Sequence, residues 1–202
     1  NPWIAVTCQG FGASCWWPNK DHQSDEPDSM MISITVPKGL EDISNGRLRR
    51  KTELKNATRY DWAVTYPINN YNVTFNIGKF AHFGDTYQSA DGSLLTCDYY
   101  VMPDNLDKAR KQFRQVQTML TCFEKYFGKY PFYRDGYKLV ESPHLGMEHQ
   151  TAVAYGNQYR QGYNGSSSSP EGLKFDFIII HESAHEWWGN SLTARDASDM
   201  WI

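Results

Sequence analysis

The segment His181-Glu182-Ser183-Ala184-His185 carries two imidazoles and a carboxylate at a spacing that can do chemistry. On a helix, residues four positions apart lie on the same face, so His181 and His185 can reach one metal ion. Zn²⁺ suits them because it accepts neutral nitrogen ligands in a tetrahedral site. Glu182 can take a proton from a water whose pKa the metal lowers, and then deliver it to a leaving amine. The segment therefore predicts one bound zinc ion and a hydrolytic reaction.

A second candidate lies upstream, in residues 145–150, where Gly146, Met147 and Glu148 precede a β-prone run. A carboxylate beside a glycine at the start of a strand can lie at the edge of a cleft. Taken alone, the pattern also fits a solvated surface glutamate.

The elements that must position these residues are predicted in the second half of the chain. A helix begins at Ser169, with Ser169 as N-cap and Pro170 in its first turn, and ends at Gly189, so that it carries the histidines. Strands are predicted over residues 137–140 and 150–155. A further helix face, ended by Gly128, consists of Phe113, Val116, Leu120, Phe123 and Phe127.

The first half reads as β-structure. Strands are predicted over residues 30–36, 60–66, 71–77 and 94–102, with a hairpin turn at Asn45-Gly46. We therefore predict an α+β protein with a β-rich domain over residues 1–102 and a second domain over residues 103–202.

Composition excludes several other classes. The 202 residues are 40% hydrophobic and 21% charged, which is typical of a folded protein. Lys and Arg number 20 against 23 Asp and Glu, and no basic tract is present, so nucleic acid is not expected as a partner. No apolar run is long enough to predict a membrane span.

Together the two candidate segments resemble the aminopeptidase N (M1) family of zinc metallopeptidases, a gluzincin family with a thermolysin-like catalytic domain. Residues 181–190 are similar to its HExxHxWxGN block, and Gly146-Met147-Glu148, about 33 residues before His181, are similar to its GxMEN exopeptidase motif. A looser match, Trp16-Trp17-Pro18 with Asp25-Glu26-Pro27, looks like the end of the family's N-terminal β-domain.

The resemblance implies a role for each matched side chain. His181 and His185 are then zinc ligands, and Glu182 is the general base. Glu148 would hold the free α-amino group of a peptide, because a carboxylate in a dry site bonds an ammonium strongly. The implied activity is that of an aminopeptidase acting on peptides with a free N-terminus.

The resemblance also implies a fold. The chain would comprise the C-terminal part of an antiparallel β-domain, followed by the front half of a thermolysin-like domain. Backbone around Gly146 and Met147 would pair with the peptide like an added strand.

Two departures from the family pattern matter. Leu145 and His149 stand where GxMEN has Gly and Asn. The family's third zinc ligand, a Glu roughly eighteen residues beyond the second histidine, would fall about two residues after Ile202. We therefore expect the 202-residue chain alone to bind zinc weakly and to be inactive. Two alternatives stay open for the intact protein: a zinc endopeptidase in which Glu148 is structural, and a non-catalytic homologue kept for binding.

Three further features are ambiguous from sequence. Glu186 follows the second histidine and can support the metal site or lie at the surface. Asp176 precedes the first histidine and can support it from behind. Tyr155, Tyr159 and Tyr163 form an aromatic group for which packing is the better interpretation.

The chain opens at Asn1-Pro2-Trp3 without a signal-peptide pattern and ends at Met200-Trp201-Ile202, which suggests a fragment cut at both ends. Aromatic residues make up 15% of it. The four cysteines are expected to be buried free thiols, with a Cys8–Cys15 disulfide as the alternative. The aromatic content, the sequons at Asn56, Asn72 and Asn164 and that possible disulfide favour an exported or cell-envelope protein, although a cytoplasmic one is not excluded.

Overall fold

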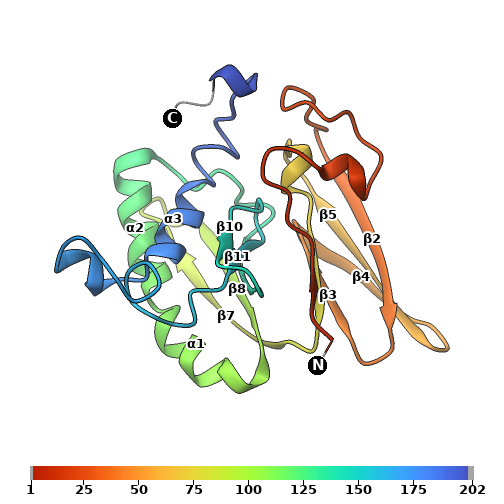
Figure 1. Ribbon diagram of the computed structural model, residues 1–202, viewed down its shortest axis with the longest axis horizontal. Coiled ribbons are helices and arrows are strands. Elements are labelled where there is room, and N and C mark those ends of the chain that lie inside the picture. The colour runs from red at the N-terminus through yellow and green to blue at the C-terminus, as the bar shows by residue number, and fades with distance from the viewer. Residues whose placement is uncertain (1, 200–202) are drawn as a thin grey trace.

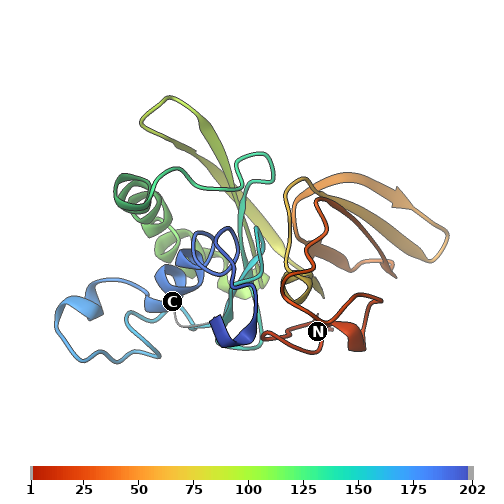
Figure 2. The same cartoon turned by 90° about the horizontal axis from the view of Figure 1, so that it is seen from above.

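A computed structural model describes residues 2–199 of the chain (Figure 1). Residues 1 and 200–202, at the two ends that suggested a fragment, lie outside the described residues. The described chain forms three layers (Figures 1 and 2). Helices cover one face of a five-stranded sheet, and two three-stranded sheets lie on its other side. The predicted α+β class is confirmed.

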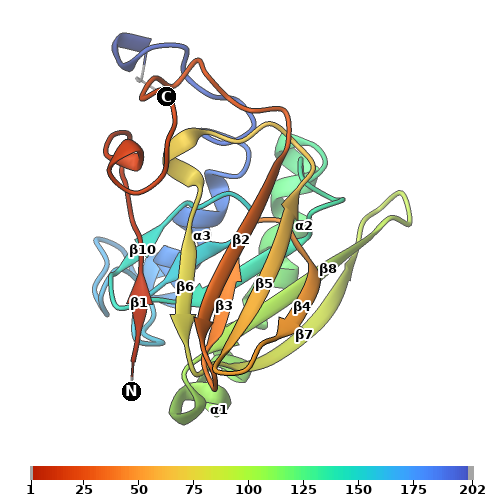
Figure 3. The ribbon, with the colours of Figure 1, turned by 90° about the vertical axis from the view of Figure 1, so that its right-hand side faces the viewer.

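The two smaller sheets are antiparallel and enclose their own core (Figure 3). Strand β2 contributes to this core through Ile32 and Val36, whose buried side chains alternate with more exposed residues. This pattern is expected for a strand with one face exposed to solvent. In one of these sheets the spatial order is β2 (Met30–Pro37), β5 (Ala57–Val64), β4 (Arg47–Glu53). In the other sheet it is β1 (Ile4–Ala5), β6 (Phe75–Gly78), β3 (Glu41–Ser44).

The predicted hairpin at Asn45-Gly46 is wrong. The chain does turn there, with Gly46 at a positive φ of 72°. However, β3 pairs with β6 and β4 pairs with β5, so the turn carries the chain from one sheet into the other. Asn45 is buried and bonds to other segments, which leaves the flanking strands free to diverge.

The five-stranded sheet is mixed. Strand β9 pairs in parallel with β8 and β11, whereas the outer pairs are antiparallel. Strands β7 and β8 precede residue 102. The domain boundary predicted at that residue would therefore separate two strands of this sheet from the other three. The spatial order is β10 (Gly146–Met147), β11 (Val153–Tyr155), β9 (Tyr137–Glu141), β8 (Leu94–Val101), β7 (Ala81–Gln88).

Three α-helices pack on one face of the mixed sheet, and their apolar faces form the larger core with it. The prediction of a helix ended by Gly128 is confirmed, because α2 ends at Phe127 and Gly128 adopts a positive φ of 90°. The α-helices are α1 (Leu106–Gln112), α2 (Gln115–Phe127) and α3 (Phe177–Ala184). Short 3₁₀ helices cover Ala13–Cys15, Asn70–Asn72, Pro103–Asn105, Glu171–Lys174 and Ala197–Asp199.

The helix predicted from Ser169 to Gly189 begins later and ends earlier than expected, since α3 spans Phe177–Ala184. Ser169 caps only the short 3₁₀ helix, where its Oγ accepts a hydrogen bond from the amide of Gly172. Phe175 is extended and interrupts the helical path. The α-helix starts afresh after Asp176, whose carboxylate accepts from the amide of Ile178. Among residues 2–199, no helix is long and apolar enough to cross a membrane.

Candidate metal centre

Helix α3 is held firmly at its N-terminal end. Ile178 and Ile179 are buried in the larger core, which fixes the helix against the mixed sheet. Asp176 is also buried and accepts hydrogen bonds from Tyr155 Oη at 2.6 Å and Asn157 Nδ2 at 2.7 Å. Asp176 therefore supports the histidines indirectly, as the cap of their helix.

The histidines converge as the spacing predicts. One ligand atom from each of His181, Glu182 and His185 lies within 4.8 Å of the others. The imidazole rings are 4.9 Å apart and nearly perpendicular. The Nδ1–H of His185 donates to the carbonyl oxygen of Trp188 at 2.9 Å, and this bond leaves the Nε2 lone pair available to a metal. Stacking on Phe177 orients the ring of His181.

The donor set fits a divalent ion of the zinc type. Two imidazole nitrogens and one carboxylate are ligands that Zn²⁺ prefers. Within residues 2–199, His181, Glu182 and His185 make up the one group of three or more potential ligand residues that lie this close together. Burial, and then the neighbouring His185, lower the pKa of His181, so its imidazole is neutral and free to bind a metal at neutral pH.

Glu182 lies against strand β10. Its side chain is buried, and burial followed by the charge of Glu148 raises its pKa to about 8. A side chain on Gly146 would meet it, since a Cβ built there would lie 2.5 Å from Glu182 Oε1. Gly146 therefore lets the backbone of the strand approach this carboxylate.

Glu148 is not a solvated surface residue. It is only 9% exposed, and its Oε1 accepts a hydrogen bond from Tyr71 Oη at 3.3 Å. Its negative charge acts on the pKa of both His181 and Glu182, so it faces the same site. A pocket of about 170 Å³ opens beside it and is lined in part by Tyr71, His185, Trp188 and Thr193.

Gly146 and Met147 form β10, which lies at the edge of the mixed sheet. The side chain of Met147 is buried against Tyr71 and Ala154, which anchors this edge strand. The structure thus brings together all six residues predicted for the site: His181, Glu182, His185, Gly146, Met147 and Glu148.

Glu186 links two of the segments that carry site residues through a buried hydrogen bond. It is fully buried, and its Oε1 accepts from the amide of Thr151 at 2.7 Å. Burial raises its pKa to about 8. The bond ties the residue after His185 to the segment that follows Glu148.

Sequence reasoning missed Tyr71 and Asn72, which reach the site from the N-terminal sheets. Tyr71 contacts Glu148, and Asn72 Nδ2 donates to Asn190 Oδ1 at 2.7 Å. The only pattern at Asn72 was a glycosylation sequon, which its burial in the folded chain argues against.

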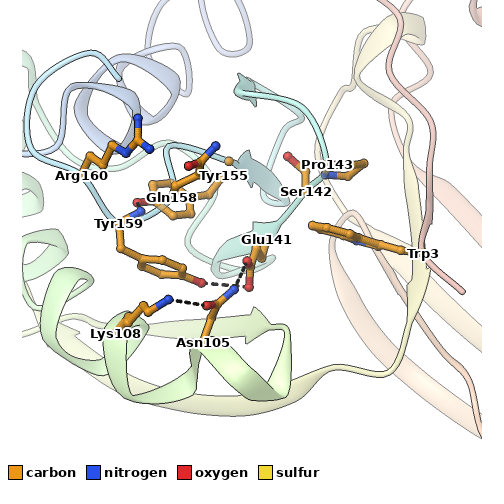
Figure 4. Close-up of a pocket in the computed structure, with 11 residues that line it drawn as sticks. Trp3, Asn105, Lys108, Glu141, Ser142, Pro143, Tyr155, Gln158, Tyr159 and Arg160 are labelled. Atoms are coloured by element: carbon orange, nitrogen blue, oxygen red, sulfur yellow. Dashed lines mark hydrogen bonds between the residues drawn. The ribbon is translucent and has the colours of Figure 1, made fainter. Parts of the chain in front are cut away.

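A second pocket, of about 410 Å³, has no histidine among its lining residues (Figure 4). Its carboxylate, Glu141, already accepts hydrogen bonds from Asn105 Nδ2, the Met102 amide and Tyr159 Oη, at 2.7 to 2.9 Å. These bonds fasten the start of α1 to β9. Tyr155 and Tyr159 pack on Phe113, as the packing interpretation predicts, whereas Tyr163 is 52% exposed.

No family model matches the chain. Curated relatives nevertheless agree on one class. The chain is 25% identical over 174 residues to leucyl aminopeptidase of Saccharolobus solfataricus, which covers 85% of the chain and 21% of that protein. It is 25% identical over 158 residues to aminopeptidase N of Escherichia coli, covering 76% of the chain and 18% of that protein. The chain thus spans about a fifth of the length of these relatives.

Solved structures agree in fold. The M1 zinc metallopeptidase of Deinococcus radiodurans superposes with a TM-score of 0.74 at 17% identity, over 96% of this chain and 42% of that one. The resemblance to the aminopeptidase N (M1) family is confirmed. Another structure of the Deinococcus enzyme, a mutant bound to a Tyr-Ser-Ala substrate, matches with a TM-score of 0.74 at 16% identity. The M1 fold therefore frames the histidines and Glu148 in this chain.

Proposed function

We propose that the intact protein is a zinc aminopeptidase that removes single residues from the N-terminus of peptides. The observation that carries this proposal is the burial of Glu148 beside His181, Glu182 and His185. A buried carboxylate next to a hydrolytic centre is suited to bind an ammonium group. Internal peptide bonds offer no such group at that position.

The residues divide the chemistry among them. His181 and His185 would hold one Zn²⁺, with a third ligand from outside the described residues. When bound, Zn²⁺ supplies Lewis acidity that polarises a carbonyl oxygen and acidifies water. Glu182 takes a proton from the attacking water and delivers it to the leaving amine. Burial raises the pKa of this carboxyl, so its ionised form is a stronger proton acceptor than the carboxylate of an exposed glutamate.

Glu148 fixes the register of cleavage. Its carboxylate would pair with the α-ammonium of the substrate, so that the first peptide bond falls at Glu182. The edge strand β10 would align the peptide backbone, since an edge offers unpaired amide and carbonyl groups. The Deinococcus relative bound to Tyr-Ser-Ala supports a peptide as the ligand class.

The test compares two peptides on the full-length protein, one with a free amine and one N-acetylated. We expect the free-amine peptide alone to be cleaved, and Glu182→Gln to abolish turnover. Equal cleavage of both peptides would instead indicate an endopeptidase. Absence of turnover by metal-loaded protein would indicate a binding homologue.

Zinc binding is tested by isothermal titration. The full-length protein is expected to bind one Zn²⁺ per chain. The 202-residue chain, with two histidine ligands, is expected to bind weakly and to leave aminoacyl anilides intact. Micromolar or tighter binding together with turnover by the short chain would overturn this expectation.

For location we propose export or the cell envelope, supported by the aromatic content and the sequons Asn56 and Asn164. The four cysteines, all among the described residues, are free thiols in the structure. Fractionation of the source cells tests the proposal, and recovery of the protein only from the cytoplasm would contradict it.

A further inference from the structure

Two short segments of the N-terminal sheets bond through buried side-chain amides to segments next to Glu148, the predicted amine-binding residue. They are the turn before β4, with Asn45, and the 3₁₀ helix that contains Asn72. We propose that Asn72 is a positioning residue, which acts through Asn190 to fix the backbone of Glu148 in front of the zinc helix. The inference rests on the proposed aminopeptidase function and assigns part of its specificity to the N-terminal sheets.

The connection consists of two short hydrogen bonds. Asn72 Nδ2 donates to Asn190 Oδ1 at 2.7 Å, and Asn190 Nδ2 donates to the carbonyl oxygen of Glu148 at 2.8 Å. Asn72 is completely buried and Asn190 is 3% exposed, so bulk water does not compete for either bond. Asn190 lies five residues beyond His185, and the chain of bonds therefore spans the N-terminal sheets, the zinc-helix segment and β10.

A second set of bonds holds the segment that follows Glu148. Asn45 Nδ2 donates to the carbonyl oxygens of Asn72 at 2.9 Å and Gln150 at 2.6 Å. The amide of Gly46 donates to Thr151 Oγ1 at 2.8 Å. Asn45 thus links the backbone of Asn72 to the backbone two residues beyond Glu148.

The backbone at Thr151 indicates that this segment is constrained. Thr151 has a positive φ of 57°, which is unfavourable for a β-branched residue. Such a conformation persists only where surrounding contacts enforce it, and it clusters at functional sites. Here the contacts are the Gly46 amide on its Oγ1 and the Glu186 carboxylate on its amide.

The direction of the two amide bonds makes the proposal specific. The carbonyl oxygen of Glu148 can only accept, so Asn190 must present its Nδ2 there and its Oδ1 to Asn72. Aspartate at position 72 has no donor for that Oδ1. Asn190 would then have to rotate its amide to satisfy the aspartate, which would turn its oxygen towards the Glu148 carbonyl. Asn72→Asp therefore breaks the connection with almost no change in side-chain volume.

A matched control lies in the same 3₁₀ helix. Asn70 is also buried, but its Nδ2 donates to Asn19 Oδ1 and to the Lys20 carbonyl oxygen, away from Glu148. Asn70→Asp therefore makes the same chemical change without touching the connection. A second test variant, Asn190→Asp, can still accept from Asn72 but cannot donate to Glu148.

The experiment uses the full-length, zinc-loaded protein and measures kcat and KM for an aminoacyl anilide, with zinc content and Tm. For Asn72→Asp and Asn190→Asp we expect KM to rise on the order of tenfold, because about 1.4 kcal/mol of positioning is lost. We expect kcat to change less than KM, since Glu182 and the histidines stay in place. Asn70→Asp should keep the KM of the unmodified protein.

The outcomes separate the inference from the proposed function. If the unmodified protein cleaves free-amine peptides selectively but KM of both test variants is unchanged, the positioning role is refuted. If all three aspartate variants lose Tm and activity in parallel, the role of Asn72 is structural and the inference again fails. If the unmodified protein itself does not distinguish free from acetylated peptides, the proposed function fails first.

Discussion

At the scale of single residues, Gly146 lets strand β10 approach Glu182, the residue that we propose as the general base. A Cβ on Gly146 would lie 2.5 Å from Glu182 Oε1 and 2.8 Å from Ile178 Cγ2. Gly146→Ala should therefore displace the carboxylate of the proposed base. We expect kcat of the full-length protein to fall on the order of tenfold to a hundredfold, since misplacement by about 1 Å can cost that much. Zinc content should be unchanged.

Steady-state kinetics and metal analysis test this prediction, with Gly78→Ala as the control. The three atoms nearest to a Cβ on Gly78 would be side-chain atoms of Phe80 and Met102, at 3.2 to 3.4 Å. Unchanged kcat in the Gly146 variant would show that Glu182 can move aside and still act.

Asp42 gives a prediction about pH and stability. It is fully buried, and burial raises its pKa from the usual 3.8 to about 7, although the indole N–H of Trp62 donates to it at 3.1 Å. Its stabilising contribution is therefore complete below pH 3.8 and is lost as pH rises towards 7, because the unfolded chain ionises first. Asp42→Asn keeps an acceptor for Trp62 and removes the charge.

The Asn variant should match the parent near pH 4 and exceed it above pH 7, by at most about 4 kcal/mol in unfolding free energy. Urea denaturation at a series of pH values measures the difference. A constant difference across the series would show that Asp42 does not titrate in this range.

Residue by residue, the sequence predicted what local spacing controls. His181, Glu182 and His185 lie within one helical turn or so, and their convergence follows from helix geometry alone. Tyr71 and Asn72 could not be found in this way, because their partners Glu148 and Asn190 lie far along the chain. Only the folded arrangement of the sheets brings them together.

At the scale of elements, Asp176, the N-cap of helix α3, should contribute strongly to the stability of the fold. The carboxylate of Asp176 accepts four hydrogen bonds, from Ile178, Asn157, Gln112 and Tyr155. Asp176→Ala leaves the Ile178 amide and the Tyr155 hydroxyl without their acceptor, whereas Asn157 and Gln112 keep backbone acceptors. We expect the loss to cost about 3 kcal/mol. Because the cap precedes His181, zinc affinity of the full-length protein should fall as well. Calorimetric Tm and zinc titration measure both effects.

Asp91→Ala serves as the comparison for this prediction. Asp91 accepts from the amide of Ser93 and pairs with Lys129 at an exposed turn, and its loss should cost less than about 1 kcal/mol. Equal losses in the two variants would mean that Asp176 is no more than an ordinary surface cap.

The elements also show where sequence patterns fail. The helix face predicted from Phe113 to Phe127 is confirmed over residues 115–127, where its apolar period and the terminal Gly128 agree, but Phe113 lies before this helix, at the C-cap of α1. The helix from Ser169 was placed too early, because Ser-Pro-Glu is an equally good start for a short 3₁₀ helix. The turn at Asn45-Gly46 was expected to form a hairpin, but partner strands from elsewhere in the chain competed successfully for β3 and β4.

At the scale of the whole molecule, buried polar groups join the N-terminal sheets to the mixed sheet. Asn45 bonds across to Gln150, and the ammonium of buried Lys138 donates to the carbonyl oxygen of Gly46. Burial lowers the pKa of Lys138 to about 8. Polar groups that lose water on assembly are costly when separated from their partners. We propose that the division between the two parts falls between β6 and β7, and that the parts unfold together.

Native-state hydrogen exchange tests this cooperativity. In the full-length protein we expect amides of β5, in the N-terminal sheets, and β9, in the mixed sheet, to exchange with opening free energies within about 1 kcal/mol of each other. Asn45→Ala removes the donor to the Asn72 and Gln150 carbonyls and the acceptor for the Thr74 amide. It should lower both values together, by about 2 kcal/mol or more.

The comparison variant is Asn56→Ala, whose exposed side chain lies in the turn before β5 and should leave both values unchanged. Protection of β5 that is weaker than that of β9 by several kcal/mol in the unmodified protein would mean that the N-terminal sheets open on their own. Such opening would break the hydrogen bond from Asn72 to Asn190 only in the small fraction of molecules that are open. The position of Glu148 in the native state therefore does not depend on cooperative unfolding, and the exchange experiment tests cooperativity separately from the KM measurements on Asn72.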